Sequence, residues 1–226
     1  MYNEPIDVIL TSYNRFDLLE STLDSFFYTN DYPINSFQVV DDYGQLYMNA
    51  KDKLHIEILK EKYPQITWIT PNQREGQIYS LDYMWKNVTT KYCFQMEDDW
   101  QFYRRNYIRN SIEVLEEYPE IVMCWLREQN DTNSHPVVKS DNGKFDYMVT
   151  NHNSDLFHGY SFNPSVKRLA DYQKIGCFLD HTHFQPTVPW KSESDISNLY
   201  YKLGYKAAIF PKGYVRHIGK DRGIRR

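Results

Sequence analysis

Short apolar runs alternate with amphipathic stretches through the first half of the chain. Strands are predicted for the runs at 6–10, 37–40, 66–70 and 92–96. Between them, apolar side chains repeat at helical spacing from Leu18 to Phe27, and further helices are predicted over 50–62 and 78–87. This alternation favours an α/β fold, with a mostly parallel central sheet and helices on both faces.

The alternation extends past residue 100 and then gives way to an irregular region. Residues 128–155 are polar, with a turn signal at Asp141-Asn142-Gly143. We expect the strand predicted at 121–126 to join the same parallel sheet. The remaining predicted elements are helices at 106–118, 165–174 and 194–203 and a strand at 206–210. Because no linker or repeat interrupts the sequence, a single domain over 1–226 is expected.

Two of the predicted helices begin with capping signals. Asp17 is expected to cap the first helix, with Glu20 three residues later as its capping-box partner. Ser165 can likewise cap the helix predicted to follow it.

Composition and charge exclude several classes of protein. A chain of 226 residues, of which 41% are hydrophobic, can bury the core of one compact domain. The formal net charge of −4 gives no reason to expect a nucleic-acid partner. No apolar run reaches the roughly 18 residues of a membrane-spanning helix. The basic tail, with Lys220, Arg222, Arg225 and Arg226, is either a solvated end or a peripheral contact with an anionic membrane.

The cysteines and the N-terminus indicate a reducing compartment. Cys93, Cys124 and Cys177 are odd in number and lack zinc-binding spacing, and the first two fall inside predicted strands. Buried free thiols are therefore expected. Residues 1–5 are polar and do not resemble a signal peptide. A cytoplasmic location is the expectation.

An acidic triplet, Glu97-Asp98-Asp99, directly follows the strand predicted at 92–96. Adjacent carboxylates repel each other unless a cation lies between them. Oxygen ligands favour Mg²⁺ or Mn²⁺, and these ions commonly bind substrate phosphates. The alternative is a solvated acidic turn without a ligand.

Polar clusters also follow the other three strands of the first half. They are Thr11 to Arg15, Asp41-Asp42, and Gln73 to Gly76. The carboxyl ends of parallel strands meet at one edge of a sheet, so we expect these clusters to converge on the acidic triplet. An acid at the second strand end can accept a hydrogen bond from the imino N–H of uracil, thymine or guanine. Arg74 in the third loop can approach a diphosphate.

Three of these segments resemble the GT-A nucleotide-sugar glycosyltransferases, especially those of family 2. They are residues 8–15 (VILTSYNR), 39–44 (VVDDYG) and 97–99 (EDD). The last is similar to the Asp-X-Asp signature of the family, with Glu in its first place. The resemblance implies that Asp99 is a ligand of Mn²⁺ or Mg²⁺ and that Glu97 is a weaker one, acting through water. With the strand-end positions, it implies nucleotide-sugar contacts for Thr11, Tyr13, Asn14, Arg15, Asp41, Asp42, Arg74, Gly76 and Asp98.

The resemblance continues in the second half of the chain. Residues 193–205 are similar to the acidic helix of the family, in which Glu193 takes the place of the catalytic aspartate. The alternative is that Glu193 only stabilises a helix N-terminus. Residues 215–219 (VRHIG) resemble the C-terminal His-Ile-Gly segment of many GT-A enzymes, which implies that His217 completes the metal sphere.

The function implied by the resemblance is metal-dependent, inverting sugar transfer. The donor is a nucleotide diphosphate sugar, with a UDP-sugar favoured, and the acceptor is a hydroxyl group, expected to belong to a glycan. Residues 1–100 are then the nucleotide-binding half and 101–226 the acceptor half. Two other functions stay open. The first is a metal-dependent phosphohydrolase, which is supported by Asp180-His181-Thr182-His183 as a candidate metal-binding motif. The second is a catalytically inactive nucleotide-sugar binding module. It is supported by Glu97 and Ser192, which both stand where the family pattern has aspartate or another acid.

Overall fold

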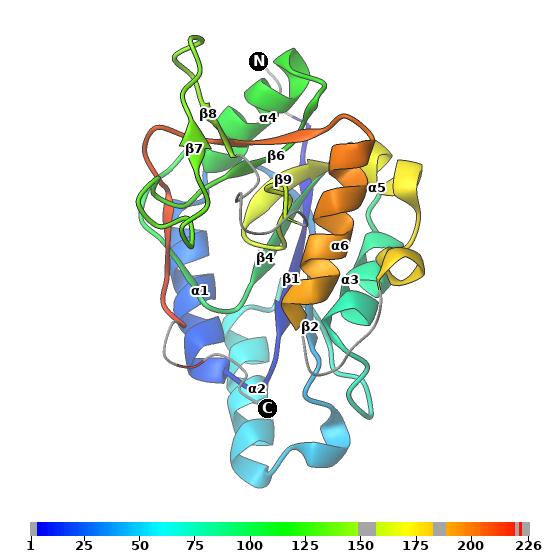
Figure 1. Ribbon diagram of the computed structural model, residues 1–226. Coiled ribbons are helices and arrows are strands. Elements are labelled where there is room, and N and C mark those ends of the chain that lie inside the picture. Colours follow the sequence, from blue (N-terminus) through cyan, green and yellow to red (C-terminus); the bar gives the residue numbers. More distant parts are fainter. Residues whose placement is uncertain (1–3, 149–156, 183–188, 220–221, 223–226) are drawn as a thin grey trace.

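Each apolar run of the first half forms a strand of one central sheet, as shown in Figure 1. In spatial order the strands are β3 (Thr67–Ile69), β2 (Ile34–Asp41), β1 (Ile6–Ser12), β4 (Tyr92–Glu97) and β9 (Ser165–Arg168). The first four are parallel, and β9 pairs antiparallel with β4. The predicted mostly parallel sheet is confirmed. The computed structural model describes residues 4–148, 157–182, 189–219 and 222.

Helices cover both faces of this sheet (Figure 1). One face carries α1 (Phe16–Thr29), α2 (Ala50–Lys62) and α4 (Tyr107–Glu117). The other carries α3 (Gln77–Trp85), α5 (Leu169–Ile175) and α6 (Pro189–Lys202). Successive strand residues point to opposite faces, so Val8 and Leu10 enter the first core and Ile9 enters the second.

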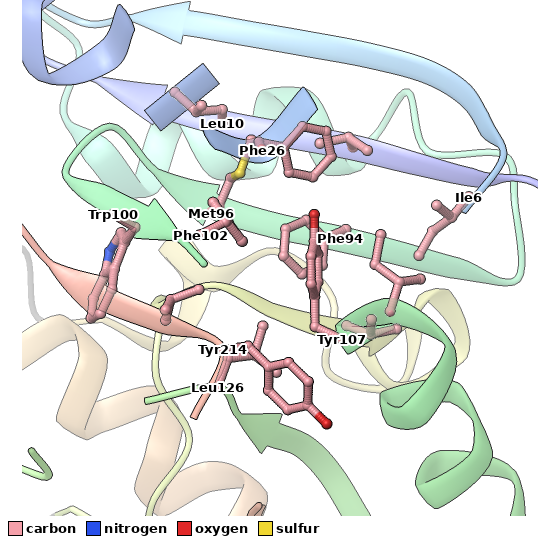
Figure 2. Packing of buried hydrophobic residues seen from close by; sticks show 14 of the residues in the cluster. Ile6, Leu10, Phe26, Phe94, Met96, Trp100, Phe102, Tyr107, Leu126 and Tyr214 are labelled. Atoms are coloured by element: carbon pink, nitrogen blue, oxygen red, sulfur yellow. The ribbon is translucent and has the colours of Figure 1, made fainter. Parts of the chain in front are cut away.

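Aromatic rings fill the core beneath α1 and α4. Figure 2 shows Phe26 of α1 beside Phe94 of β4, with ring centres 5.8 Å apart. The ring centre of Tyr107 in α4 lies 5.5 Å from that of Phe94 and 5.1 Å from that of Phe102. These separations are typical of favourable aromatic pairs. Aromatic residues make up 16% of the sequence, and core packing accounts for part of them while it fixes α1 and α4 against β4.

The strand predicted at 121–126 does not join the central sheet, and that prediction is wrong. It forms β6 (Ile121–Trp125) of a second sheet. The order of that sheet is β6, β10 (Lys206–Ile209), β8 (Asp146–Met148) and β7 (Val137–Val138). The physical reason is that β9 already occupies the free edge of β4. The turn signal at Gly143 is confirmed, because β7 and β8 pair antiparallel across it.

The helix predicted over 165–174 begins four residues later than expected. Residues 165–168 form β9, and α5 starts only at Leu169. Pairing with β4 satisfies the backbone groups of this segment, so tertiary contacts override its local helical preference. Ser165 is therefore a buried strand residue and not a helix cap.

Asp17 does not cap the first helix. Arg15 is the N-cap residue of α1 and makes no side-chain cap bond. Asp17 lies in the first turn instead, where an acid stabilises the positive end of the helix dipole, and it pairs with Arg222. The predicted capping box of Asp17 and Glu20 is wrong.

Two short strands that the sequence did not predict form a separate ribbon. β5 (Trp100–Phe102) pairs antiparallel with β11 (Val215–His217), which sets His217 opposite Trp100. The backbone N–H of Trp100 donates to Thr22 Oγ1 at 3.1 Å, which fixes the ribbon to α1. Short 3₁₀ helices, η1 (Gln45–Tyr47) and η2 (Phe178–His181), complete the described elements. None of the helices in the part of the chain that the structure describes has both the length and the apolar character of a membrane span.

Candidate functional site

A cleft lies at the carboxyl ends of β1, β2 and β4. The loop after β1 lines it with Thr11, Ser12, Tyr13 and Arg15. The other lining residues are Asp42, Arg74, Gln77, Glu97 and Asp98. Strand ends that are distant in sequence therefore converge, as expected for a parallel sheet. Of the predicted contact residues, Asn14, Asp41 and Gly76 lie outside the cleft lining.

Asp98 organises the loop after β1. It is fully buried and accepts hydrogen bonds from Ser12 Oγ at 3.0 Å, from the Tyr13 N–H at 3.3 Å, and from the Arg15 guanidinium. Arg15 Nη1 also donates to Asp99 Oδ2 at 2.7 Å, so one guanidinium bridges two carboxylates. Burial raises the pKa of Asp98 to about 6 in spite of Arg15. Asp98 thus holds Tyr13 and Arg15 at the cleft.

Asp41 and Asp42 each fix a different loop. Asp41 accepts the backbone N–H of Asn14 at 3.0 Å and lies behind the cleft. Asp42 accepts the N–H groups of Glu75 and Gly76, both at 2.9 Å, which fixes the start of α3. Burial raises the pKa of both acids. Asp42 is the member of the pair that lines the cleft.

Tyr13 and Arg74 form an aromatic and cationic wall at the cleft. The Tyr13 ring packs edge-on against Tyr43, with centres 5.5 Å apart. The Arg74 guanidinium carbon lies 4.6 Å from the centre of the Tyr13 ring, and Arg74 Nε lies 3.8 Å from Asp42 Oδ2. A flat apolar ring beside a cation suits a planar, heteroaromatic ligand that carries negative charge.

Glu97 lies at the boundary between this cleft and α6. Its Oε1 accepts from Gln77 Nε2 at 2.9 Å, and its Oε2 accepts from Trp100 Nε1 at 3.4 Å. Burial raises the pKa of Glu97 to about 7, and the negative charges of Asp99 and Glu193 add to the effect. Gln77 was not predicted as a site residue, although it directly follows the predicted Gly76.

Asp99 and His217 form the candidate ion-binding pair. His217 Nε2 lies 3.1 Å from Asp99 Oδ2, and the imidazole packs 5.0 Å from the Trp100 ring centre. Burial opposes ionisation of Asp99, but His217 and Arg15 together lower its pKa. Neighbouring ligands of an octahedral ion with bonds of about 2.1 Å lie roughly 3 Å apart, so the pair fits Mn²⁺ or Mg²⁺.

Glu97 does not complete a three-ligand site with this pair. Within the described ranges, no three His, Cys, Asp or Glu side chains form a group that would hold a metal ion. Mg²⁺-type sites, however, often use one or two protein ligands and take the rest from water and substrate phosphates. The donor set of Asp99 and His217 fits that kind of site.

The absence of a side chain at Gly219 leaves room for the Asp99 carboxylate. A Cβ at this position would lie 2.5 Å from Asp99 Oδ2, closer than real Cβ contacts. Gly219→Ala is therefore expected to displace the carboxylate from His217 and to weaken Mn²⁺ binding by about tenfold or more, as measured by calorimetric titration. Gly204→Ala is the control, because a Cβ there meets no atom within 4 Å. Equal Mn²⁺ affinities in the two variants would contradict the expectation.

Glu193 approaches the same region from α6. Its Oε1 accepts the Phe162 N–H at 2.7 Å, and burial raises its pKa. Because α6 begins at Pro189, Glu193 lies beyond the first turn, where the helix dipole acts most strongly. Stabilisation of the helix N-terminus is therefore a poor explanation for this acid. Gln95 of β4, two residues before Glu97, donates to the carbonyl oxygen of the same Phe162 at 3.3 Å, which places Glu193 beside the strand that carries Glu97.

The motif at 180–183 and the basic tail are described only in part. His181 ends η2, and its Nε2 lies 2.6 Å from the Ile175 carbonyl oxygen. His183 lies outside the described residues, as do Lys220, Arg225 and Arg226. The histidine pair and the membrane contact therefore remain predictions.

A model of the family described as glycosyl transferase family 2 matches residues 7–176. A comparison with curated proteins gives no significant match. Among solved structures, this chain is similar to the mannosyltransferase PcManGT from Pyrobaculum calidifontis in complex with GDP-Man and Mn²⁺. The TM-score is 0.69 and the identity 17%, over 99% of this chain and 59% of that one.

Staphylococcus aureus TarS is also similar. Its residues 1–349 give a TM-score of 0.61 at 16% identity, over 94% of this chain and 60% of that chain. The same fragment in complex with UDP gives a TM-score of 0.59 at 15% identity. This chain thus spans about three fifths of the length of the mannosyltransferase and of the TarS fragment. The family match confirms the family that the sequence resemblance implied. The chain belongs to glycosyl transferase family 2 and has the GT-A fold.

Proposed function

We propose that this glycosyltransferase moves a sugar from a nucleotide diphosphate sugar, with a UDP-sugar favoured, to a hydroxyl group of a glycan, with inversion at the anomeric carbon. The observation that carries the proposal is that Phe162 bonds both to Glu193 and to Gln95 of β4, the strand whose end carries half-buried Glu97 and then Asp99. The candidate ion-binding acid and the candidate base then both lie near the carboxyl end of β4, and a displacement reaction at a sugar carbon requires such proximity.

The cleft residues bind the donor in this proposal. The Tyr13 ring faces the base, and Arg74 approaches the diphosphate. Asp99 and His217 would hold Mn²⁺ or Mg²⁺. When bound, such an ion neutralises the charge that develops on a diphosphate leaving group. The mannosyltransferase bound to GDP-Man and Mn²⁺ and TarS bound to UDP support this donor class.

Glu193 acts as the general base in this proposal. Its carboxylate takes the proton of the acceptor hydroxyl while that oxygen bonds to the anomeric carbon and the bond to the diphosphate breaks. The Phe162 N–H holds Oε1 and so fixes the direction of the carboxylate. Its raised pKa brings it closer to neutral pH, which makes it a better proton acceptor than an ordinary glutamate.

A donor screen tests the proposal. Melting temperatures are measured with UDP-, GDP- and dTDP-sugars, each with and without Mn²⁺, and sugar transfer is then assayed with the best donor. At a ligand concentration of 100 Kd, binding stabilises a protein by about 2.7 kcal/mol. We expect a UDP-sugar with Mn²⁺ to give the largest shift and to be consumed. Phosphate release from a simple ester without a sugar acceptor would favour a phosphohydrolase, and tight binding without turnover would favour an inactive binding module.

A further inference from the structure

A lysine is buried on the face of the central sheet that carries Glu97. Lys167 of β9 is only 3% exposed, and its Nζ donates to Ser165 Oγ at 2.7 Å. Within the described residues this hydroxyl is its one hydrogen-bond acceptor, although an ammonium has three donors. The centre of the Tyr160 ring lies 5.3 Å from Lys167 Nζ, and a cation–π interaction with this ring compensates part of the positive charge. Burial of such a poorly paired ammonium is costly for the folded state.

The strand register explains why this lysine faces the site. Lys167 pairs with Cys93 of β4, and Ser165 pairs with Gln95. Alternate residues of a strand share a face, so Cys93, Gln95 and Glu97 point to the same side as Lys167. The charges of Glu193 and Glu97 both act on Lys167, as does the Cys93 thiol. The lysine therefore lies within electrostatic reach of the candidate base.

Among the described residues, the groups that face Glu193 come from several elements. Glu97 of β4 adds negative charge, and Arg127, two residues after β6, adds positive charge. The phenol of Tyr160 also lies near it. Arg127 already has a carboxylate partner, Asp131, at 2.9 Å. Lys167 is the buried cation whose charge is left to balance Glu193 and Glu97.

We propose that Lys167 is a positioning residue for sugar transfer, which helps to keep Glu193 ionised at slightly acidic pH, where the lysine is charged, at the expense of stability. The inference rests on the proposed function of Glu193 as the base. Without a cation beneath them, two neighbouring carboxylates in a half-buried site repel each other, and one of them takes up a proton. A protonated Glu193 cannot accept the proton of the acceptor hydroxyl.

The first test is the pH dependence of transfer by Lys167→Met. We expect the acidic limb of the kcat/KM profile to move upward by about one pH unit, because one unit corresponds to a tenfold change in the ionised fraction of the base below its pKa. Activity at pH 6 should then fall about tenfold more than activity at pH 9. Lys91→Met is the control, because Lys91 is exposed and directly precedes β4, at the end of the strand away from the cleft.

The second test is the melting temperature of the same variant. Burial lowers the pKa of Lys167 to about 7, against the opposing effect of the carboxylates. The unfolded chain therefore binds more protons between about pH 7 and pH 10, and stability rises with pH through that window. Lys167→Met removes this penalty and should melt at the same or a higher temperature at pH 7. A purely structural lysine predicts a lower melting temperature and an equal loss of activity at every pH.

Additional variants separate the possible failures. If Lys167→Met does not fold, Lys167→Gln replaces it, since its amide can still donate to Ser165. In the Glu193→Gln background, Lys167→Met should leave the pH profile of the residual activity unchanged. Full activity of Glu193→Gln alone would overturn the proposed function. An inactive Glu193→Gln together with a wild-type pH profile in Lys167→Met would overturn only the role of Lys167.

Discussion

Glu193→Gln is expected to lower kcat for sugar transfer by about 10²–10⁴-fold, the usual contribution of a general base. Glutamine has nearly the same size, and its carbonyl oxygen can still accept the Phe162 N–H, so the fold of α6 should not change. The amide cannot accept the proton of an acceptor hydroxyl. Donor affinity should stay close to that of the unchanged protein, because the cleft lining does not include Glu193.

Asp195→Asn is the matched control for this experiment. It makes the same acid-to-amide change in α6, two residues further along the helix. Steady-state transfer rates and donor titrations are measured for both variants. Full activity in Glu193→Gln, with loss of activity in Asp195→Asn, would move the catalytic role from Glu193 to Asp195.

Arg15→Met is expected to lower the free energy of unfolding by about 3–5 kcal/mol, as is usual when one partner of a buried ion pair is removed. Arg15 is mostly buried and bridges Asp98 and Asp99, and Asp98 is fully buried. The change leaves two adjacent carboxylates without their common cation.

Urea denaturation with and without Mn²⁺ measures this effect. Arg222→Met is the control, because Arg222 forms an exposed pair with Asp17, and such pairs contribute about 0–1 kcal/mol. If Asp99 holds the ion, saturating Mn²⁺ should restore part of the stability of Arg15→Met. Equal stabilities of the two variants would show that Arg15 is not needed to neutralise the acids.

Local signals predicted the elements of the first half well. The helix predicted over 50–62 is observed as Ala50–Lys62. The Asn49 side chain caps it by accepting the Asp52 N–H at 3.0 Å, and the Asp52 carboxylate accepts the Asn49 N–H in return. The cleft followed from topology, since parallel strands bring their carboxyl ends together whatever their loops contain.

Pairings between distant segments could not be derived from one sequence. The segment that became β9 is four residues long, and its partner β4 lies some 70 residues earlier. β5 and β11 have three residues each, too few for a periodic pattern. His217 was linked to Asp99 by family resemblance and not by any local pattern. Lys167 was not predicted as a site residue. A lysine in a polar-looking stretch gives no sign in the sequence that it is buried.

Residue types at the site were easier to predict than their detailed positions. The acids at the end of β2 were expected to face a ligand, but Asp41 accepts a backbone N–H of the neighbouring loop. Which acid of an adjacent pair faces the cleft depends on side-chain alternation at the last strand residue and on the turn that follows. Neither can be read from the pair itself.

The pairing of β5 with β11 has a consequence for folding of the chain during its synthesis on the ribosome. Asp99 and His217 are 118 residues apart, so the histidine emerges long after the strands beneath it can fold. Arg15 is synthesised before both acids that it contacts, and can neutralise them as soon as they appear. During synthesis, the Arg15 guanidinium can thus stabilise the acidic edge of the sheet until the segment that carries His217 has been made.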